Sequence, residues 1–466
     1  WWAVAFSIVA TETSTITFIS IPGVAFARGG NFGFLQLVFG YLLGRIVISI
    51  LFIPSYFRGE LLTVYQLLDQ RFGGKIKMVA ASLFVVMRNI ADGIRLLLTA
   101  IVLSAVYAAF QPAADSGTII VASIILIGLA MIIFTYFGGM EAVIWVEVVQ
   151  LGIYIAGAIA AAVVLLSYIN GGLATVSSVA TQFGKYSLFD FTFDHTRTFT
   201  FWSGLIGGCF LTMSTHGTDQ YLVQRYLCTD HPRKATVALL TSGAIVLAQF
   251  IGFLFIGVLL FAFYHPFTDP AYATAASTAF PFTGGDRVFP DFITKYMPTG
   301  LSGLVVAAIF AAAMSSSLNS IAATAVNDLY KPFRPNREDK HYLKVSHLLT
   351  LIWGVVQIGV ALAVRNQPGS ALSMALSIAS LINGPILGVF LVGTFLRRVS
   401  QPPALIGMLV SIASMLYVFF ETKIAWTWYV FLGSLITFVV AWAASFAFAP
   451  NALSPIGSIA PVPDEE

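Results

Sequence analysis

One carboxylate stands out because it lies where a membrane span should be apolar. Glu12 sits in the stretch SIVATETSTITFIS, residues 7–20, among Ile, Val, Ala and Thr. A charged carboxylate at the centre of a bilayer costs at least about 2.5 kcal/mol, so it needs a partner or a wet cavity. Two interpretations remain open: Glu12 contacts a solute or cation, or it forms a buried ion pair with an intramembrane arginine.

Three more charged residues share one face of a helix in MRNIADGIRLL. Arg88, Asp92 and Arg95 follow an i, i+4, i+7 spacing. One interpretation is an internal Arg–Asp–Arg ladder that hides all three charges. In the other, two arginines against one aspartate leave a guanidinium free to bind a carboxylate of the solute. Arg95 lies deeper in its span than Arg88, so we favour it as the solute-binding residue.

Hydroxyl groups cluster in AAAMSSSLNS, residues 311–320. They are hard oxygen donors without formal charge, which suits a weakly held monovalent cation such as Na⁺. The alternative is that the small residues only allow close helix packing. Ala10, Thr13 and Thr17 share a helix face where the first span is expected to unwind.

The amino-acid composition is that of a membrane protein. Of 466 residues, 58% are hydrophobic and 10% are charged, whereas soluble domains carry about 25% charged residues. We therefore predict an all-α polytopic membrane protein whose partner is the lipid bilayer and not nucleic acid. No nucleophile triad, phosphate loop or metal-ligand spacing argues for an enzyme. The chain opens at Trp1 without a methionine, so we expect that N-terminal sequence is missing.

Apolar windows of about 20 residues predict twelve spans. Their ranges are 2–26, 34–56, 76–110, 117–138, 141–169, 199–227, 233–264, 300–329, 341–364, 370–397, 402–420 and 425–448. Most Lys and Arg residues fall in the loops after the second, sixth, eighth and tenth spans. The positive-inside rule then predicts an inner (plasma) membrane protein with those loops and Trp1 on the cytoplasmic side.

Two spans contain interruptions that break the apolar pattern. They are TETSTIT at 11–17 and LTMSTHGTDQ at 211–220. The two spans lie five helices apart, so they cross the membrane in opposite directions. Paired interruptions in two inverted halves indicate a transporter binding site, where unwound backbone offers carbonyl oxygens to a cation.

Several motifs together give a resemblance to a known family. They are YFGGMEAVIWVEVVQ (136–150), TDQYLVQRYL (218–227), GYLLGR (40–45) and the YKPF that follows the eighth span. The chain resembles the sodium:solute symporter family, which includes bacterial sodium–galactose, sodium–proline and sodium–sialic acid carriers.

The resemblance implies a leucine-transporter-type five-plus-five inverted repeat with two additional C-terminal helices. The family normally has one more helix before the first repeat, and we expect it to belong to the missing N-terminal sequence. The expected divisions are a first repeat (1–169), an external loop (170–198), a second repeat (199–398), two C-terminal helices (399–448) and a cytoplasmic tail (449–466).

The resemblance also implies a sodium site built from the first and eighth helices. Its ligands would be Ala10, Thr13, Ala312, Ser315 and Ser316. Counting back from Asn319 would instead put the family's serine pair on Ala312 and Ala313; we prefer Ser315 and Ser316 because the site needs hydroxyls and counting forward from Gly303 agrees. Some family members hold a second cation with an acid in the fifth helix, which here gives Glu147 with Asn319. The alternative for Glu147 is a hydrated carboxylate near the start of its span.

Solute-binding residues follow from the same resemblance. The matching positions are Glu12, Thr17, Gln36, Thr212, Thr215 and His216. Sialic acid carriers place a carboxylate-binding arginine in the helix that holds Arg95. The expected function is secondary active transport that couples Na⁺ influx to uptake of a small organic solute, with a carboxylate-bearing solute such as a sugar acid favoured and a monomeric transport unit. The alternatives are a neutral sugar or amino acid as solute, proton coupling, or a membrane sensor input domain.

Overall fold

The computed structural model describes residues 1–58, 61–111, 115–137, 140–265, 285–314, 317–366, 371–449 and 456. Throughout these ranges every regular element is helical. The first half of the chain forms α1 (Trp2–Glu12), α2 (Thr15–Phe26), α3 (Leu35–Leu51), α4 (Ile53–Tyr56), α5 (Gln66–Phe72), α6 (Gly74–Phe110), α7 (Ser116–Phe137), α8 (Met140–Tyr168) and α9 (Gly172–Gln182).

The second half continues in the same manner. It forms the π-helical segment η2 (Ser203–Gly207), α10 (Gly208–Gly217), α11 (Gln220–Tyr226), α12 (Pro232–Tyr264), α13 (Val288–Lys295), α14 (Thr299–Met314), α15 (Leu318–Thr324), the π-helical segment η5 (Ala325–Tyr330), α16 (Asp339–Val364), α17 (Ala371–Phe395), α18 (Gln401–Glu421) and α19 (Tyr429–Ala444).

The long helices agree with the predicted spans. Within the described residues, nine helices are long and apolar enough to cross a membrane, and the bent pair α1–α2 brings the number to ten. The predicted sixth span consists of η2, α10 and α11, and the eighth consists of α14, α15 and η5. These two spans are divided into pieces too short to pass the same length criterion.

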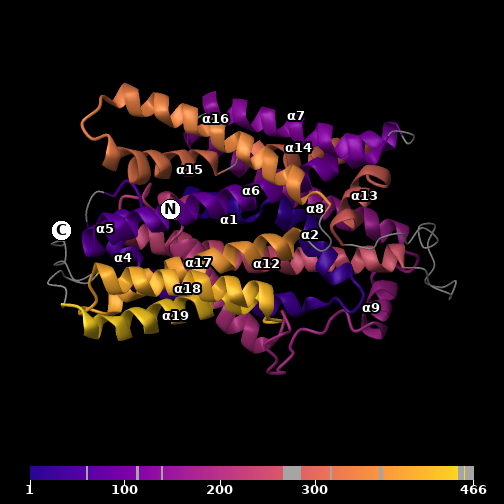
Figure 1. Ribbon diagram of the computed structural model, residues 1–466. Coiled ribbons are helices and arrows are strands. Elements are labelled where there is room, and N and C mark those ends of the chain that lie inside the picture. Colours follow the sequence, from indigo (N-terminus) through magenta and orange to yellow (C-terminus); the bar gives the residue numbers. More distant parts are fainter. Residues whose placement is uncertain are drawn as a thin grey trace.

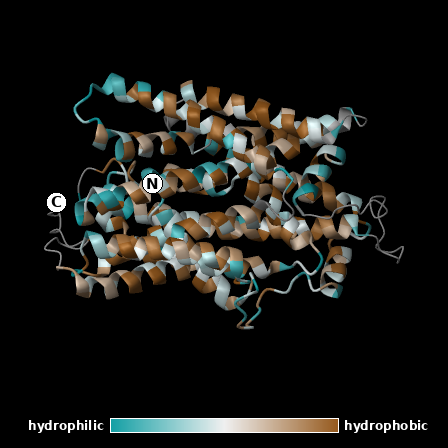
Figure 2. Ribbon diagram, in the orientation of Figure 1, coloured by the Kyte–Doolittle hydropathy of each residue, from teal (hydrophilic) through white to brown (hydrophobic). Residues whose placement is uncertain are grey.

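The outer helices present apolar side chains where lipid would lie. Leu126 and Ile133 on α7 and Val355 on α16 are exposed. Figure 2 shows hydrophobic residues along the outer helices and hydrophilic ones gathered toward the ends of the bundle. Helices α1, α2, α6 and α8 run through the middle, with α7 and α16 on one side and α18 and α19 on the opposite side (Figure 1). One end of the bundle carries α4 and α5, and the other carries α9 and α13.

Both predicted interruptions are present as helix breaks. Helix α1 ends at Glu12 and α2 begins at Thr15, with the two axes bent by 60°. The hydroxyls of Thr11 and Thr13 donate to backbone carbonyls one turn back, at 2.7 and 2.6 Å; such bonds compete with regular helix geometry. Helix α10 ends at Gly217, and α11 begins after Asp219.

Two glycines on α3 let that helix approach α10 closely. A Cβ atom on Gly40 would lie 2.4 Å from the Gly204 carbonyl oxygen, and one on Gly44 would lie 2.6 Å from that of Cys209. Small residues four apart are a usual device for close helix packing in membranes. This packing brings Arg45, the residue after Gly44, to the two breaks.

Candidate functional site

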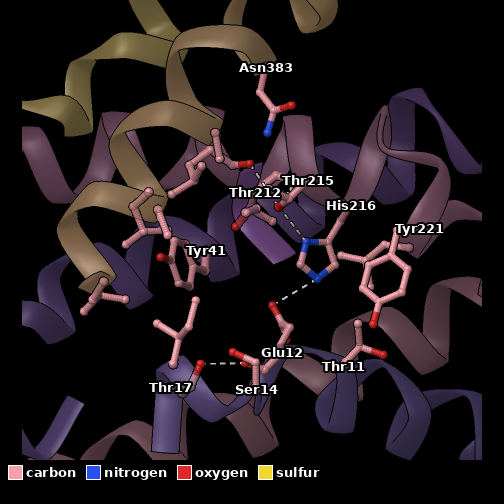
Figure 3. Close-up of a pocket in the computed structure, with 18 of the residues that line it drawn as sticks. Thr11, Glu12, Ser14, Thr17, Tyr41, Thr212, Thr215, His216, Tyr221 and Asn383 are labelled. Atoms are coloured by element: carbon pink, nitrogen blue, oxygen red, sulfur yellow. Dashed lines mark hydrogen bonds and ion pairs between the residues drawn. The ribbon is translucent and has the colours of Figure 1, made fainter. Parts of the chain in front are cut away.

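A cavity of about 200 Å³ lies between the two broken spans. Helices α1, α2, α3, α6, α10, α11, α12 and α17 all contribute to its wall. Figure 3 shows Tyr41, Thr17 and Thr212 on one side of it and Asn383 at the far end. The polar and charged groups of the wall are Thr11, Glu12, Ser14, Thr17, Tyr41, Arg88, Arg95, Thr212, Thr215, His216, Tyr221 and Asn383.

Glu12 forms an ion pair at the edge of this cavity. Its Oε2 lies 2.5 Å from Nη2 of Arg45, and its Oε1 lies 3.0 Å from Nε2 of His216. Nδ1 of His216 is 3.0 Å from the Thr215 hydroxyl (Figure 3). The Arg45 side chain is 1% exposed and that of Glu12 is 17% exposed. Glu12 therefore forms the ion pair of one interpretation and borders the cavity, while its contact with a solute or cation stays a prediction.

Arg88 reaches from α6 to the break in the sixth span. Its guanidinium bonds the carboxylate of Asp219, the residue that caps the N-terminus of α11. It also stacks over the Tyr221 ring, with 4.7 Å between its Cζ atom and the ring centroid. Asp219 thus supplies the counter-charge that the sequence interpretation did not find for Arg88.

Arg95 pairs within its own helix. Its Nη1 lies 3.3 Å from Oδ1 of Asp92, while Oδ2 of Asp92 accepts the backbone N–H of Ser317 at 3.1 Å and also the Ser317 hydroxyl. The same carboxylate therefore serves both the guanidinium and the start of α15. The side chain of Arg95 is 11% exposed and lines the cavity.

These contacts correct the charge count made from the sequence. The sequence pattern shows two arginines on α6 against one aspartate, but the break in the sixth span adds a second aspartate, Asp219. Each arginine on α3, α6 and α11 has a carboxylate partner, in the pairs Arg45–Glu12, Arg88–Asp219, Arg95–Asp92 and Arg225–Glu147. An anionic solute is therefore not needed to neutralise an otherwise unpaired arginine.

Glu147 lies in a second cluster that is sealed from solvent. Its carboxylate accepts from Nη2 of Arg225 at 2.8 and 3.1 Å and contacts the hydroxyls of Ser7 and Thr11 at 3.3 and 3.4 Å. Both charged side chains are 1% exposed. The cluster joins α8, α11 and α1, and the Arg225 guanidinium supplies the positive charge beside Glu147.

Two of the five expected sodium ligands, Ala10 and Thr13, lie at the α1–α2 break. Ala10 and Thr13 are buried in the last turn of α1 and at its end. Ala312 is in the last turn of α14, and Ser315 and Ser316 lie outside the described residues. Helix α14 runs beside the break, since the Thr15 hydroxyl reaches the Ile309 carbonyl oxygen at 3.4 Å. Asn319 is in the first turn of α15.

Six of the seven expected solute-binding residues line the one cavity. Gln36 is the exception, because backbone groups occupy its side-chain amide: Nε2 donates to the carbonyls of Gly33 and Phe199 at 3.1 and 3.3 Å, and Oε1 accepts from Asp190 N–H at 2.9 Å. In the structure Gln36 holds the loop before η2 against α3. Its assignment to the solute stays a prediction.

Sequence reasoning missed several wall residues. Tyr41 follows Gly40 in the GYLLGR motif, and Tyr221 follows Gln220 in the TDQYLVQRYL motif, so motifs already noted contained both. Asn383 lies on α17, in a span with many small and apolar residues. A single amide in such a span carried no spacing signal.

Comparison with known proteins bears on what this arrangement does. The family model described as the sodium:solute symporter family matches residues 1–411. The chain belongs to this family. It is a multi-pass membrane protein and a sodium-coupled solute symporter, not an enzyme.

Individual relatives of this symporter cover most of the chain. The sodium/sialic acid symporter NanT of Aliivibrio fischeri is 31% identical over 460 residues, which are 97% of this chain and 86% of that protein. The human sodium-coupled monocarboxylate transporter 1 is 27% identical over 392 residues, which are 83% of this chain and 61% of that protein.

A solved structure supports the same conclusion. It is that of a substrate-bound, outward-open Na⁺-coupled sialic acid symporter, which matches with a TM-score of 0.81 at 27% identity and covers 97% of this chain and 91% of the other. The predicted leucine-transporter-type fold is confirmed.

Proposed function

We propose that the symporter takes up a small solute that carries a carboxylate, and that Arg95 binds that group. The observation that carries the proposal is the position of Arg95 in the cavity wall, beside an aspartate whose second oxygen is engaged by Ser317. A guanidinium has five N–H donors in a fork that matches a carboxylate. The N-terminus of α2, which has no side-chain cap, borders the same cavity and favours negative charge.

The rest of the wall favours a hydroxylated acid such as a sugar acid. Hydroxyl and amide groups of Thr17, Thr212, Thr215 and Asn383 border the cavity and can bond solute hydroxyls. The names of two relatives support an acid, since one carries sialic acid and another monocarboxylates. Glu12 contributes an acceptor for solute hydroxyls from its position at the cavity edge.

One sodium ion is proposed at the α1–α2 break. The carbonyls of Ala10 and Thr13 belong to the last turn of α1, where helix carbonyls have no intrahelical partner. Ala312, Ser315 and Ser316 would supply the remaining oxygens. We do not propose a second sodium ion at Glu147 and Asn319, because Arg225 already neutralises that carboxylate.

Transport would follow from alternating access around this site. The repeats 1–169 and 199–398 would move against each other, with sodium favouring the state that binds solute. We propose that the end with α4 and α5 faces the cytoplasm, as the distribution of Lys and Arg predicts, and that the protein works as a monomer in the inner (plasma) membrane.

The proposal that the solute carries a carboxylate is tested by comparing an acid with its neutral analogue. Binding of a sugar acid and of its neutral alcohol analogue is measured for the purified wild type and for Arg95→Gln. If Arg95 binds the solute carboxylate, Arg95→Gln should lose about 2–5 kcal/mol of affinity for the acid. Its affinity for the neutral analogue should barely change. Equal losses for both ligands would show that Arg95 holds α6 in place, and a neutral solute would then be favoured.

The sodium site is tested on the hydroxyls of the eighth span. Ser315→Ala combined with Ser316→Ala should raise the Na⁺ concentration for half-maximal uptake at least ~10-fold, about 1.4 kcal/mol. Uptake into proteoliposomes is measured against Na⁺ at constant ionic strength. An unchanged sodium curve in a folded, inserted variant would remove both serines from the site.

Proton coupling is a second candidate because Glu12 and His216 lie 3.0 Å apart at the cavity edge. The two candidates differ in a simple measurement. Uptake that depends on Na⁺ at fixed pH, and that a pH gradient alone does not drive, supports sodium coupling.

A further inference from the structure

A single amide lies in the wall of an otherwise apolar groove between α8 and α12. The groove has a volume of about 350 Å³, and its lining residues are Ile155, Ala158, Ile159, Ala162, Ile245, Ala248, Gln249, Gly252, Phe253, Phe255 and Ile256. Gln249 is the one polar member of this set. An amide without compensating hydrogen bonds costs several kcal/mol in an apolar medium, so a glutamine here needs a specific hydrogen bond.

That hydrogen bond leads to the α1–α2 break. The Thr13 hydroxyl lies 2.9 Å from Oε1 of Gln249 and 2.6 Å from the Val9 carbonyl oxygen, and its single proton can go to only one of these two oxygens. With the proton on the Val9 side, the Gln249 amide turns its Nε2 toward Thr13 and donates to the hydroxyl oxygen. Thr13 is fully buried. With Oε1 toward Thr13 instead, Nε2 of Gln249 has no hydrogen-bond partner in the described part of the chain. The contact with Thr13 is therefore the polar interaction that accounts for the amide.

Thr13 is the residue at which α1 stops. Its φ and ψ are −80° and 57°, its N–H still donates to the Val9 carbonyl at 2.8 Å, and Ser14 after it is extended. The direction of the Thr13 carbonyl depends on these backbone angles. A side chain that is held from α12 therefore restrains the orientation of that carbonyl.

We propose that Gln249 is a positioning residue for sodium, because through the Thr13 hydroxyl it fixes the backbone carbonyls at the α1–α2 break. The inference rests on the sodium site proposed above and adds a residue that does not touch the ion. Gln249 is not among the residues that line the solute cavity. Its loss should therefore weaken sodium binding and leave solute binding at saturating sodium nearly intact.

The experiment measures sodium and solute separately. Gln249→Met removes the amide while keeping the length of the side chain, and Thr13→Val removes the hydroxyl. Each should raise the Na⁺ concentration for half-maximal uptake about 3–10-fold, which corresponds to about 0.7–1.4 kcal/mol. The solute KM at saturating Na⁺ should change less than twofold. Sodium binding without solute is followed by the thermal stabilisation that NaCl gives over KCl.

The double variant decides whether the two residues act as one pair. If they do, Gln249→Met with Thr13→Val should shift the sodium curve no further than the larger single change. Ser242→Ala is the matched control, because that hydroxyl is buried on α12 and bonds the carbonyl of Leu239 in its own helix at 2.7 Å. The control should leave the sodium curve unchanged.

Three outcomes overturn the proposal: a folded Gln249→Met with an unchanged sodium curve, fully additive single effects, or a change in solute KM with no change for sodium. If Gln249→Met fails to insert, Gln249→Asn replaces it, since its shorter amide cannot keep the same contact with Thr13 and should give the same shift. Failure of the sodium-site proposal looks different, because Ser315→Ala with Ser316→Ala would then leave the sodium curve of a folded protein unchanged.

Discussion

Two glutamates in the membrane interior lie in clusters of similar chemistry and different access. Glu12 pairs with Arg45 and His216 at the edge of the cavity, with 17% of its side chain exposed. Glu147 pairs with Arg225 and two hydroxyls, with 1% exposed. Both clusters involve α1, since Glu12 ends that helix and Ser7 and Thr11 reach Glu147 from it.

We expect the difference between the clusters to separate a charge that serves transport from one that serves stability. Removing one partner of a sealed pair leaves the other charge buried without compensation, which costs about 3–5 kcal/mol. At the cavity edge, water or solute can replace a lost partner. A substitution in the Glu147 cluster should therefore lower stability more than that of Glu12. A substitution of Glu12 should lower transport more than stability.

The largest effect is expected for the sealed cluster. Arg225→Met leaves the Glu147 carboxylate buried with only the hydroxyls of Ser7 and Thr11. We expect a loss of about 3–5 kcal/mol of stability, seen as a strongly lowered midpoint of thermal unfolding in detergent and poor membrane insertion.

The double variant Arg225→Met with Glu147→Met provides the control. Replacing both members of a buried pair by apolar residues is often neutral or stabilising, so much of the lost stability should return. A double variant as unstable as Arg225→Met would mean that Arg225 acts through other contacts, such as its stacking on the Tyr221 ring.

A smaller loss of stability with a larger loss of transport is expected at the cavity edge. Glu12→Gln keeps an oxygen that can accept from Arg45 but removes the charge that pairs with it. We expect the initial uptake rate to fall at least ~10-fold, a change of about 1.4 kcal/mol. The unfolding midpoint should fall much less than in Arg225→Met. Equal destabilisation of the two variants would assign Glu12 a purely structural role.

The sequence alone predicts features that depend on neighbouring residues, but not contacts between residues far apart in the chain. Apolar windows located the nine long helices and the bent pair α1–α2 of the described residues within a few residues. The interruptions at 11–17 and 211–220 located both breaks, because hydropathy and local polarity are properties of neighbouring residues. The pairing of Arg88 with Asp219 and of Arg225 with Glu147 joins helices far apart in the chain. Such pairs depend on how helices pack, and a single sequence has no signal for that. Gln249 was missed for the same reason.

The smallest effect concerns a buried charge that has no carboxylate partner in the described chain. Lys185, in the loop after α9, is 1% exposed, and its Nζ donates to the carbonyls of Ala25, Phe26 and Ala27 at 2.9, 3.2 and 2.7 Å. Burial lowers its pKa from 10.5 to about 8. Glu12 and Glu147 are compensated by full charges, whereas among the described residues Lys185 is compensated by the carbonyl dipoles at the end of α2 and by the Phe261 ring.

The lowered pKa of Lys185 fixes the sign of a pH effect. Between about pH 8 and 10.5 the unfolded chain keeps a proton that the native protein has lost, so raising the pH stabilises the native state through this group. The wild type should therefore gain about 1–3 °C in unfolding midpoint relative to Lys185→Met between pH 7 and 9.5. Lys295→Met, which alters an exposed lysine on α13, should show no such relative gain. If the unfolding midpoint of the wild type does not rise relative to that of Lys185→Met between pH 7 and 9.5, the three carbonyls and the ring outweigh the effect of burial. Dipoles alone would then hold a buried charge as firmly as the carboxylate pairs do.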